Sequence, residues 1–311
     1  MYFKMTRAAV TVAGGAVALC LGSVPAALAA PASSTYFVPC NAGALYAAIY
    51  NAHHGETLDL APGCTYYVPG PLREIKTELT IVGYHSTLTR TWDAGSFSLL
   101  KVGGDLGCVV EGGVLNVNNN PCDGLDGDLT VIDVNFTGGG GYDAEMGGAI
   151  DNDGGVLHVI GGTFSDNETY HQGGAIYSDG QLTVNNAAIF TGNRAPYGGA
   201  IYNGDEASIG GSSFLWNTSP DEEGTLAHSD GGAIYNDGHL DLFNSGFVGN
   251  ITGGDGGAIY TKDELNAGHI TVTANTADFH GGGIYNDETV TLFASAVFSN
   301  QPDNCVDVTG C

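Results

Sequence analysis

Five tyrosines recur at one place in a repeated phrase, and their spacing could create a sugar-binding surface. Each follows the isoleucine of a G-G-A-I-Y or G-G-G-I-Y phrase. Side chains alternate along a strand, so a tyrosine next to an inward isoleucine is expected to point outward. Stacked on successive turns, the rings would form an aromatic stripe with hydroxyl edges, or would stack on one another and shield the sheet. The tyrosines are Tyr177, Tyr202, Tyr235, Tyr260 and Tyr285.

A line of aspartates accompanies the tyrosines and could bind calcium. Neighbours in a stack would approach to about 5 Å, where two unit charges repel by about 3 kcal/mol at an effective dielectric of 20 and by less than 1 kcal/mol in water. The pattern permits calcium, although the turn chemistry of Asp-Gly explains it equally well. No other cofactor is indicated. The calcium candidates are Asp153, Asp179, Asp205 and Asp237.

Catalysis on a polysaccharide would need other groups. A lyase would need Lys or Arg against a uronate, and the regular repeats hold only Arg194 and Lys262. A hydrolase needs two carboxylates about 5–5.5 Å or about 6.5–9.5 Å apart, depending on its stereochemistry. Many carboxylates here would have comparable spacings, so the least repetitive ones are the candidates. These are Glu145, Asp151 and Asp230, the last at the end of an insertion over 221–230.

The tyrosines and the line of aspartates belong to a sequence repeat, which would position them. The G-G phrase begins at six glycines, in steps of 26, 25, 33, 25 and 25 residues, and a second phrase, F-x-x-N, follows it at Phe164, Phe190, Phe214 and Phe247. A fixed period in this range is the signature of a solenoid. The six glycines are Gly147, Gly173, Gly198, Gly231, Gly256 and Gly281.

Each repeat has room for three short strands, which predicts an all-β, three-faced parallel β-helix of about 25 residues per coil. Hexapeptide and nine-residue periods are absent, so a right-handed coil is expected rather than a left-handed solenoid or a calcium roll. Stacked amides of the asparagines are expected at the turns. The isoleucines predicted to face inward are Ile150, Ile176, Ile201, Ile234, Ile259 and Ile284.

The two ends of the chain differ from the repeats. Residues 1–29 combine Lys4 and Arg7, an apolar run and a small-x-small site, which indicates a signal peptide and a secreted, extracellular or cell-surface protein. Residues 30–60 are predicted to be an N-terminal cap, with a short helix over 41–52 and the first strand. The β-helix is predicted over 61–311, with regular repeats over 147–300.

Six cysteines follow the predicted signal peptide, and an even number in an exported chain indicates disulfides. Six cysteines allow fifteen connectivities. Pairing of nearest neighbours is the simplest of them, and it would place the bridges at the ends of the solenoid and in its irregular part. The pairs would be Cys40 with Cys64, Cys108 with Cys122, and Cys305 with Cys311.

The paired phrases GGA[ILV] and F-x-x-N resemble, over residues 136–300, the repeats of polymorphic outer-membrane proteins, which are secreted adhesins. The start, VPCNAGALYAAIYNA, and the end, NQPDNC…C, are similar to secreted right-handed β-helix proteins. These belong to the pectin-lyase-like superfamily, which includes lyases and hydrolases of polysaccharides. The resemblance implies a parallel β-helix and favours an adhesin-like role, whereas fold alone does not determine function.

The net charge of −26 limits the classes of molecule that the protein is expected to bind. Such an acidic chain repels nucleic acid and anionic membranes, and no stretch after the predicted signal peptide is apolar enough for a membrane span. We therefore expect a secreted, monomeric, non-catalytic protein that binds extracellular polysaccharide or a cell-surface component. The alternatives are a polysaccharide hydrolase or lyase, and a structural component of the cell envelope.

Overall fold

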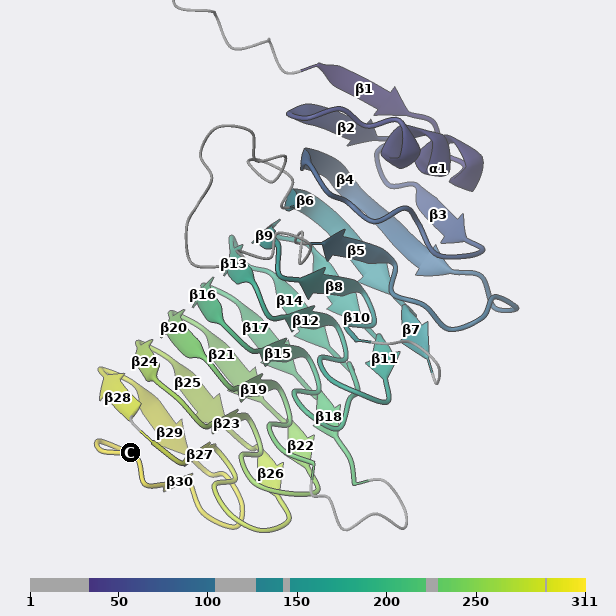
Figure 1. Cartoon of the computed structure of the whole chain (residues 1–311). Helices are drawn as coiled ribbons and strands as arrows, with labels where there is room; N and C mark the ends of the chain where they lie inside the picture. The colour runs from purple at the N-terminus through teal and green to yellow at the C-terminus, as the bar shows by residue number, and fades with distance from the viewer. Residues whose placement is uncertain (1–33, 104–126, 142–145, 222–228, 289) are drawn as a thin grey trace, which may run out of the picture. The chain divides into compact units, whose positions relative to one another are not determined.

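Successive coils of the chain run parallel, and each strand is hydrogen-bonded to its counterparts in the neighbouring coils (Figure 1). The computed structural model describes residues 34–103, 127–141, 146–221, 229–288 and 290–311. The fold is an all-β parallel solenoid of about 9 turns with ~25 residues per coil, which confirms the fold class predicted from the repeat. The handedness of the coil stays a prediction from the sequence.

Two faces of the solenoid form one 17-stranded sheet, because the long strands β4 (Glu78–Arg90) and β6 (Asp128–Thr137) run through both. The later strands of the first face are β9 (Val156–Ile160), β13 (Gln181–Asn185), β16 (Glu206–Gly210), β20 (His239–Phe243), β24 (Leu265–Gly268) and β28 (Val290–Phe293). Those of the second face are β10 (Thr163–Ser165), β14 (Ile189–Thr191), β17 (Ser213–Leu215), β21 (Gly246–Val248), β25 (Thr271–Thr273) and β29 (Ala296–Phe298).

The third face is a separate 8-stranded sheet that carries the G-G-A-I-Y phrases. Its strands are β5 (Leu100–Gly103), β8 (Ile150–Asp153), β12 (Ile176–Ser178), β15 (Ile201–Asn203), β19 (Ile234–Asn236), β23 (Ile259–Thr261), β27 (Ile284–Asn286) and β30 (Cys305–Val306). Short strands between the second and third faces pair among themselves: β7 (Gly140–Gly141), β11 (Glu168–Thr169), β18 (Thr218–Ser219), β22 (Ile251–Thr252) and β26 (Thr276–Ala277).

The two glycines of each phrase are required for different reasons. Gly198, the first of its pair, has a φ of +67°, and a Cβ there would lie 2.0 Å from the carbonyl oxygen of Ile201. Gly199, the second, would place a Cβ 2.3 Å from the carbonyl oxygen of Gly232 in the next coil. The first glycine therefore makes the corner, and the second lets neighbouring coils approach.

Columns of identical side chains fill the interior. The six isoleucines predicted to face inward have no exposed surface, which confirms that part of the pattern. Five phenylalanines stack face to face, with ring centroids 4.6–4.9 Å apart. Burial of each such side chain stabilises the fold by about 1.5–3 kcal/mol. The phenylalanine column is Phe136, Phe164, Phe190, Phe214 and Phe247.

An asparagine column stands at the end of the second face, as the F-x-x-N phrase predicts. The Oδ1 of Asn217 accepts hydrogen bonds from the backbone N–H and the Nδ2 of Asn193, at 3.1 and 2.9 Å. The Nδ2 of Asn217 in turn donates to Asn250 Oδ1 and to the carbonyl oxygen of Phe190. Each amide of this column therefore bonds to backbone groups of neighbouring coils. The column is Asn167, Asn193, Asn217, Asn250, Asn275 and Asn300.

The N-terminal end has the predicted helix. Helix α1 (Ala42–Tyr50) begins after Asn41, whose side chain accepts a hydrogen bond from the N–H of Ala44, and it buries Leu45, Ala48 and Ile49. Strand β1 (Thr35–Val38) precedes the helix and pairs with β2 (Glu56–Leu60), while β3 (Thr65–Val68) pairs with the second half of β4.

Two of the three predicted disulfides are confirmed. Cys40 bonds to Cys64 beside α1, and Cys305 bonds to Cys311 in the last coil. Cys108 and Cys122 lie outside the described residues, as do residues 1–29, which were predicted to be a signal peptide. Within the described part of the chain, no helix is long and apolar enough to cross a membrane.

Candidate functional site

The tyrosines form one column on the third face, in the register that the sequence predicts. Tyr177 pairs with Tyr202, and the pairing continues through Tyr235 and Tyr260 to Tyr285. The rings stack with centroids 5.0–5.3 Å apart. We call these five residues the tyrosine column.

The flat faces of these rings are covered. Tyr202, Tyr235 and Tyr260 are only 8%, 4% and 8% exposed, whereas Tyr177 and Tyr285 are half-buried. Each ring covers the face of the next, which is the second of the two arrangements that the sequence allows. Any ligand would therefore meet ring edges and hydroxyls.

Aspartates lie beside the hydroxyls of the tyrosine column. Tyr202 donates a hydrogen bond to Asp237 Oδ2 at 3.1 Å, and Tyr260 donates to Asp287 Oδ2 at 2.6 Å. Tyr177 donates to Asp179 Oδ2 at 3.3 Å. Burial, followed by the charge of Asp179, raises the pKa of Tyr177 to about 12. The hydroxyls therefore remain protonated hydrogen-bond donors at neutral pH.

Burial also raises the pKa of the other members of the column. For Tyr202 and Tyr235 the charge of Asp237 adds to the effect of burial, and for Tyr260 the hydrogen bond to Asp287 does so. Both causes penalise the phenolate, because a second negative charge would form in a poorly solvated place beside a carboxylate.

The residue after each of the third-face strands β12, β15, β19, β23 and β27 occupies a column of its own, which we call the turn column: Asp179, Gly204, Asp237, Lys262 and Asp287. The backbone N–H of each member donates to a carbonyl oxygen in the preceding coil, at 2.7–3.2 Å. Asp205 lies one residue beyond the turn column, because Gly204 takes the equivalent position in its coil. The predicted line of aspartates is therefore interrupted.

The turn column does not gather carboxylates around one point. Asp153 contacts Lys101 at 3.3 Å, Asp179 Oδ1 accepts a hydrogen bond from the N–H of Gly154, and Asp237 Oδ1 lies 3.8 Å from Lys262 Nζ. Within the described ranges, no group of three or more His, Cys, Asp or Glu side chains could hold a metal ion. Calcium binding stays a prediction.

The tyrosine column ends at an ion pair in the earlier coils. Asp151 takes the place of a tyrosine next to Tyr177, and Lys101 takes it one strand earlier. The Nζ of Lys101 lies 3.1 Å from Asp151 Oδ2, and Asp151 is buried. Burial opposes the charged ammonium, but the two carboxylates outweigh it and raise the pKa of Lys101. A buried pair of this kind holds one geometry and leaves Asp151 poorly suited to meet a substrate.

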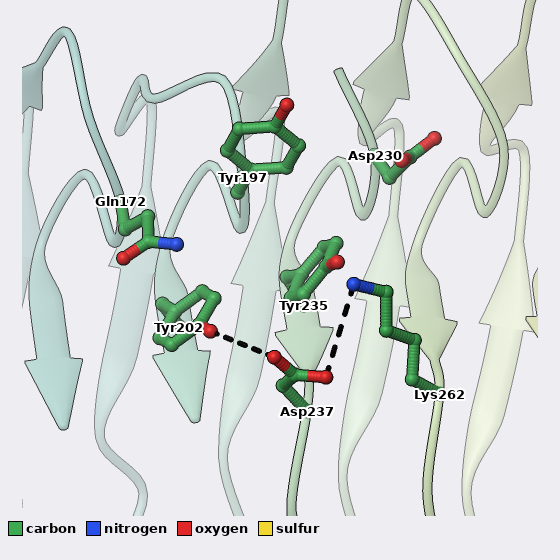
Figure 2. A pocket seen from close by; sticks show the side chains of 7 residues that line it. All are labelled: Gln172, Tyr197, Tyr202, Asp230, Tyr235, Asp237 and Lys262. Carbon is green, nitrogen blue, oxygen red and sulfur yellow. Dashed lines mark hydrogen bonds and ion pairs between the residues drawn. The ribbon is translucent and has the colours of Figure 1, made fainter. Parts of the chain in front are cut away.

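A pocket opens where the tyrosine column faces the residues that precede the G-G phrases (Figure 2). Gln172, Tyr197 and Asp230 form one side and are bridged in register. The volume is about 500 Å³, which suits one or two sugar rings better than a large cofactor. The residues that line it, which we call the tyrosine pocket, are Gln172, Tyr197, Tyr202, Asp230, Tyr235, Asp237 and Lys262.

Tyr235 lies at the centre of the tyrosine pocket (Figure 2). The ring of Tyr197 packs edge-on against it with centroids 5.4 Å apart, and Lys262 Nζ lies 5.1 Å from its ring centroid. Its hydroxyl has no hydrogen-bond partner among the residues that the structure describes, although its neighbours Tyr202 and Tyr260 donate to aspartates. This oxygen is not among the buried side-chain oxygens without a partner, so the hydroxyl is open to the pocket and available to a ligand.

Of the three catalytic candidates, the two that the structure describes are not brought together. Glu145 lies outside the described residues. Asp151 is on β8, three strands from Tyr235 on β19, a distance of about 14 Å at the usual strand spacing. Asp230 lines the pocket beside Tyr235, so the candidate pair Asp151 and Asp230 is too far apart for either hydrolase geometry.

Sequence reasoning missed three residues of the tyrosine pocket. Gln172 and Tyr197 directly precede their G-G phrases, and Lys262 replaces the aspartate of the Y-N-D phrase. Each is a departure from the repeat, which is the signal that could have identified it. Asp237 and the tyrosines were found because they are part of the repeat.

Comparison with known families supports the repeat assignment. Residues 161–179, 187–204 and 247–262 match the model of the Chlamydia polymorphic membrane protein repeat. The matched segments cover well under half of the chain and describe its repeats. No curated protein matches the chain.

Proposed function

We propose that this protein is a non-catalytic, extracellular or cell-surface binding protein that holds a glycan in the tyrosine pocket. The observation that carries the proposal is the tyrosine pocket itself, a concave site on an otherwise regular solenoid. Its lining combines ring edges with hydroxyl, amide and carboxylate groups. Such groups can donate to and accept from sugar hydroxyls while the ring edges contact the apolar parts of the sugar.

The position of the pocket supports a repetitive ligand. It spans four coils, with Gln172, Tyr197 and Asp230 in successive coils on one side, two tyrosines on the other, and Lys262 in the next coil. A linear polymer lying along the solenoid axis would meet a tyrosine edge in every coil from β12 to β27, whereas the groups on the other side differ from coil to coil. The match to repeats of polymorphic membrane proteins supports a place at the cell surface, and an adhesin-like role follows from that place.

The experiment compares two tyrosines of equal burial. Tyr202 and Tyr260 are both 8% exposed, but only Tyr202 lines the pocket. Retention on an array of polysaccharides is expected to be lost in Tyr202→Ala with Tyr235→Ala. It is expected to persist in Tyr260→Ala, with thermal melting confirming that all variants fold. Unchanged retention in the double variant, or absence of any retained glycan in the wild type, contradicts the proposal and favours a structural role in the envelope.

A second candidate function is polysaccharide hydrolysis, favoured by one observation: Asp230 and Asp237 line the same pocket. The assay is release of reducing ends from the polysaccharides that the array retains. Turnover by the wild type that is lost in both Asp230→Asn and Asp237→Asn supports the hydrolase. Retention without turnover supports the binding protein.

A further inference from the structure

The turn column alternates in charge along the tyrosine pocket. In consecutive coils, the turn column has a carboxylate, no side chain, a carboxylate, an ammonium and a carboxylate. The backbone hydrogen bonds that define the turn are the same in all five coils, so the side chains occupy equivalent positions. The members in that order are Asp179, Gly204, Asp237, Lys262 and Asp287.

Lys262 shows that an ammonium can occupy a position of the turn column. Its Nζ lies 5.1 Å from the ring centroid of Tyr235 and 3.8 Å from Asp237 Oδ1, both in the preceding coil (Figure 2). The ammonium thus combines a cation–π contact with a carboxylate, and Tyr235 is the most buried ring of the tyrosine column. An ammonium placed over a tyrosine of the third face is a stable arrangement in this fold.

Gly204 leaves the equivalent place empty two coils earlier. The coil before Gly204 supplies Tyr177 and Asp179 in the register positions that Tyr235 and Asp237 hold for Lys262. Asp179 differs from Asp237 in its partners, because its oxygens accept hydrogen bonds from the Tyr177 hydroxyl and from the N–H of Gly154. Tyr177 is half-buried, whereas the rings at the next three positions are buried, so part of its surface is uncovered. A Cβ at Gly204 would lie 3.3 Å from Tyr202 Cε1, and Tyr202 lines the pocket.

A second observation at the same pocket is independent of the carboxylates. The side chain of Tyr235 is 4% exposed, lines the pocket and has no hydrogen-bond partner for its hydroxyl among the described residues. Tyr235 Oη is not among the buried side-chain oxygens that lack a partner, so the hydroxyl is open to the pocket and can donate to a ligand there. The place at Gly204 adjoins this pocket through Tyr202.

We infer that the ligand is an amine-bearing glycan, whose ammonium occupies the place over Gly204 between Tyr177 and Asp179. The inference rests on the proposed glycan-binding function and specifies its substrate class. A sugar ring next to that ammonium would lie in the tyrosine pocket against Tyr202 and the free hydroxyl of Tyr235. A uronate-bearing glycan would instead meet Asp179, Asp230 and Asp237, so this site selects against it.

The test is a titration of the protein with two oligomers that differ by one group. One is an oligomer of glucosamine with free amines, and the other is the same oligomer with every amine acetylated. At a pH where the amine is protonated, the wild type is expected to bind the amine form about tenfold more tightly, from one cation–π contact and one partly exposed ion pair. Gly204→Lys supplies its own ammonium and is expected to abolish this preference.

Two further variants control the experiment. Gly204→Ala adds only a Cβ, which the φ of Gly204 permits. That Cβ would lie 3.3 Å from Tyr202 Cε1 and 3.4 Å from Asp179 Cβ, a close fit that a shift of a few tenths of an ångström relieves, so the variant should keep the preference. Lys262→Gly opens a second empty place between Asp237 and Asp287, and it should strengthen binding of the amine form. Thermal melting of Gly204→Lys should equal or exceed that of Gly204→Ala if the new ammonium lies beside Asp179.

The outcomes separate the inference from the function on which it rests. Equal binding of the two oligomers by the wild type, or a preference that survives in Gly204→Lys, overturns the inference and leaves glycan binding standing. Failure to bind any oligomer or array glycan overturns both. A polylysine that binds as tightly as the amine oligomer shows that the place accepts a basic protein, which overturns the assignment to a glycan.

Discussion

The solenoid carries an aromatic column on each side of its wall, and the two columns differ in their neighbours. Inside, the phenylalanines stack at 4.6–4.9 Å next to a column of asparagines. Outside, the tyrosines stack at 5.0–5.3 Å next to the turn column. The inner asparagines bond to the backbone of neighbouring coils, whereas the outer aspartates bond to tyrosine hydroxyls and a lysine.

The difference shows where the fold tolerates variation. The inner columns hold the coils together, and their members change only from Phe to Val in the last two repeats, at Val272 and Val297. The outer columns change character within five coils, from Asp to Gly to Lys at the turn. The residues of a surface column can vary because water replaces a hydrogen-bond partner that a substitution removes. A buried amide that loses its hydrogen-bond partner has no water to replace it. Four predictions test this contrast, from the largest effect to the smallest.

Truncating one ring in each column should give unequal losses. Phe214→Ala removes a fully buried ring and is expected to lower the free energy of unfolding by about 3–5 kcal/mol. Tyr260→Ala, in the outer column, is expected to cost about 2 kcal/mol, because its ring is covered only by its neighbours on the surface and its hydroxyl exchanges water for Asp287 on folding. Chemical denaturation measures both values. Equal losses would mean that the outer column is as much a core as the inner one.

Changing one polar residue in each column should separate them again. Asn217→Ala leaves the N–H of Asn193 and the carbonyl oxygen of Phe190 without their partner, which is expected to cost about 2–3 kcal/mol. Asp237→Asn keeps an acceptor for Tyr202 and loses only an exposed ion pair, so stability should change by less than about 1 kcal/mol. A large loss in Asp237→Asn would contradict the assignment of the turn column to the surface.

Alkaline pH should act on the outer column and not on the inner columns, because phenylalanine and asparagine side chains do not titrate in this range. Because the pKa of Tyr177 is raised from 10.0 to about 12, the folded protein keeps a proton that the unfolded chain releases above pH 10.0. The stability present below pH 10.0 is therefore expected to fall as pH rises towards 12. Melting temperature against pH measures this, and Tyr177→Phe should flatten the slope. A wild-type curve that is flat between these values would show that the tyrosines titrate equally in both states.

The smallest effect is expected from calcium. The chain carries a net charge of −26, so any salt should raise the melting temperature by screening repulsion. At equal ionic strength, calcium, magnesium and a chelator are expected to give the same melting temperature, because the aspartates of the turn column bond to tyrosines, the backbone and Lys262. A rise specific to calcium, lost in Asp179→Asn with Asp237→Asn, would instead establish a bound ion.

The sequence predicts the inner columns better than the outer surface. Ile201 and its equivalents, Asn217 and its equivalents, helix α1 and two disulfides follow from period, composition and spacing. The outward direction of Tyr202 also follows from alternation along a strand. The covered faces of its ring could not be predicted in this way. Alternation along a strand determines the side of the sheet on which a ring lies, but not the distance to the next ring.

The tyrosine pocket was beyond sequence reasoning for a related reason. Its far side comes from Gln172, Tyr197 and Asp230, which precede the G-G corner and face the column only after the chain has turned. Lys262 contacts Tyr235 across one coil, a separation of 27 residues that no local pattern connects. These positions can be recognised because their residues differ from the repeat. Which of the differing residues contact one another depends on the geometry of the corner.

The identity of the register from coil to coil has a consequence for the history of the gene. Isoleucine pairs with isoleucine and tyrosine with tyrosine across β12, β15, β19, β23 and β27. The second glycine of each of these phrases also lies against the carbonyl of the equivalent glycine in the next phrase, until the last one. Loss of one 25-residue unit, such as 231–255, would therefore rejoin two surfaces that already fit. Unequal exchange between repeats can thus shorten or lengthen the array in whole coils. Related genes should differ in coil number while their corners and inner columns stay constant.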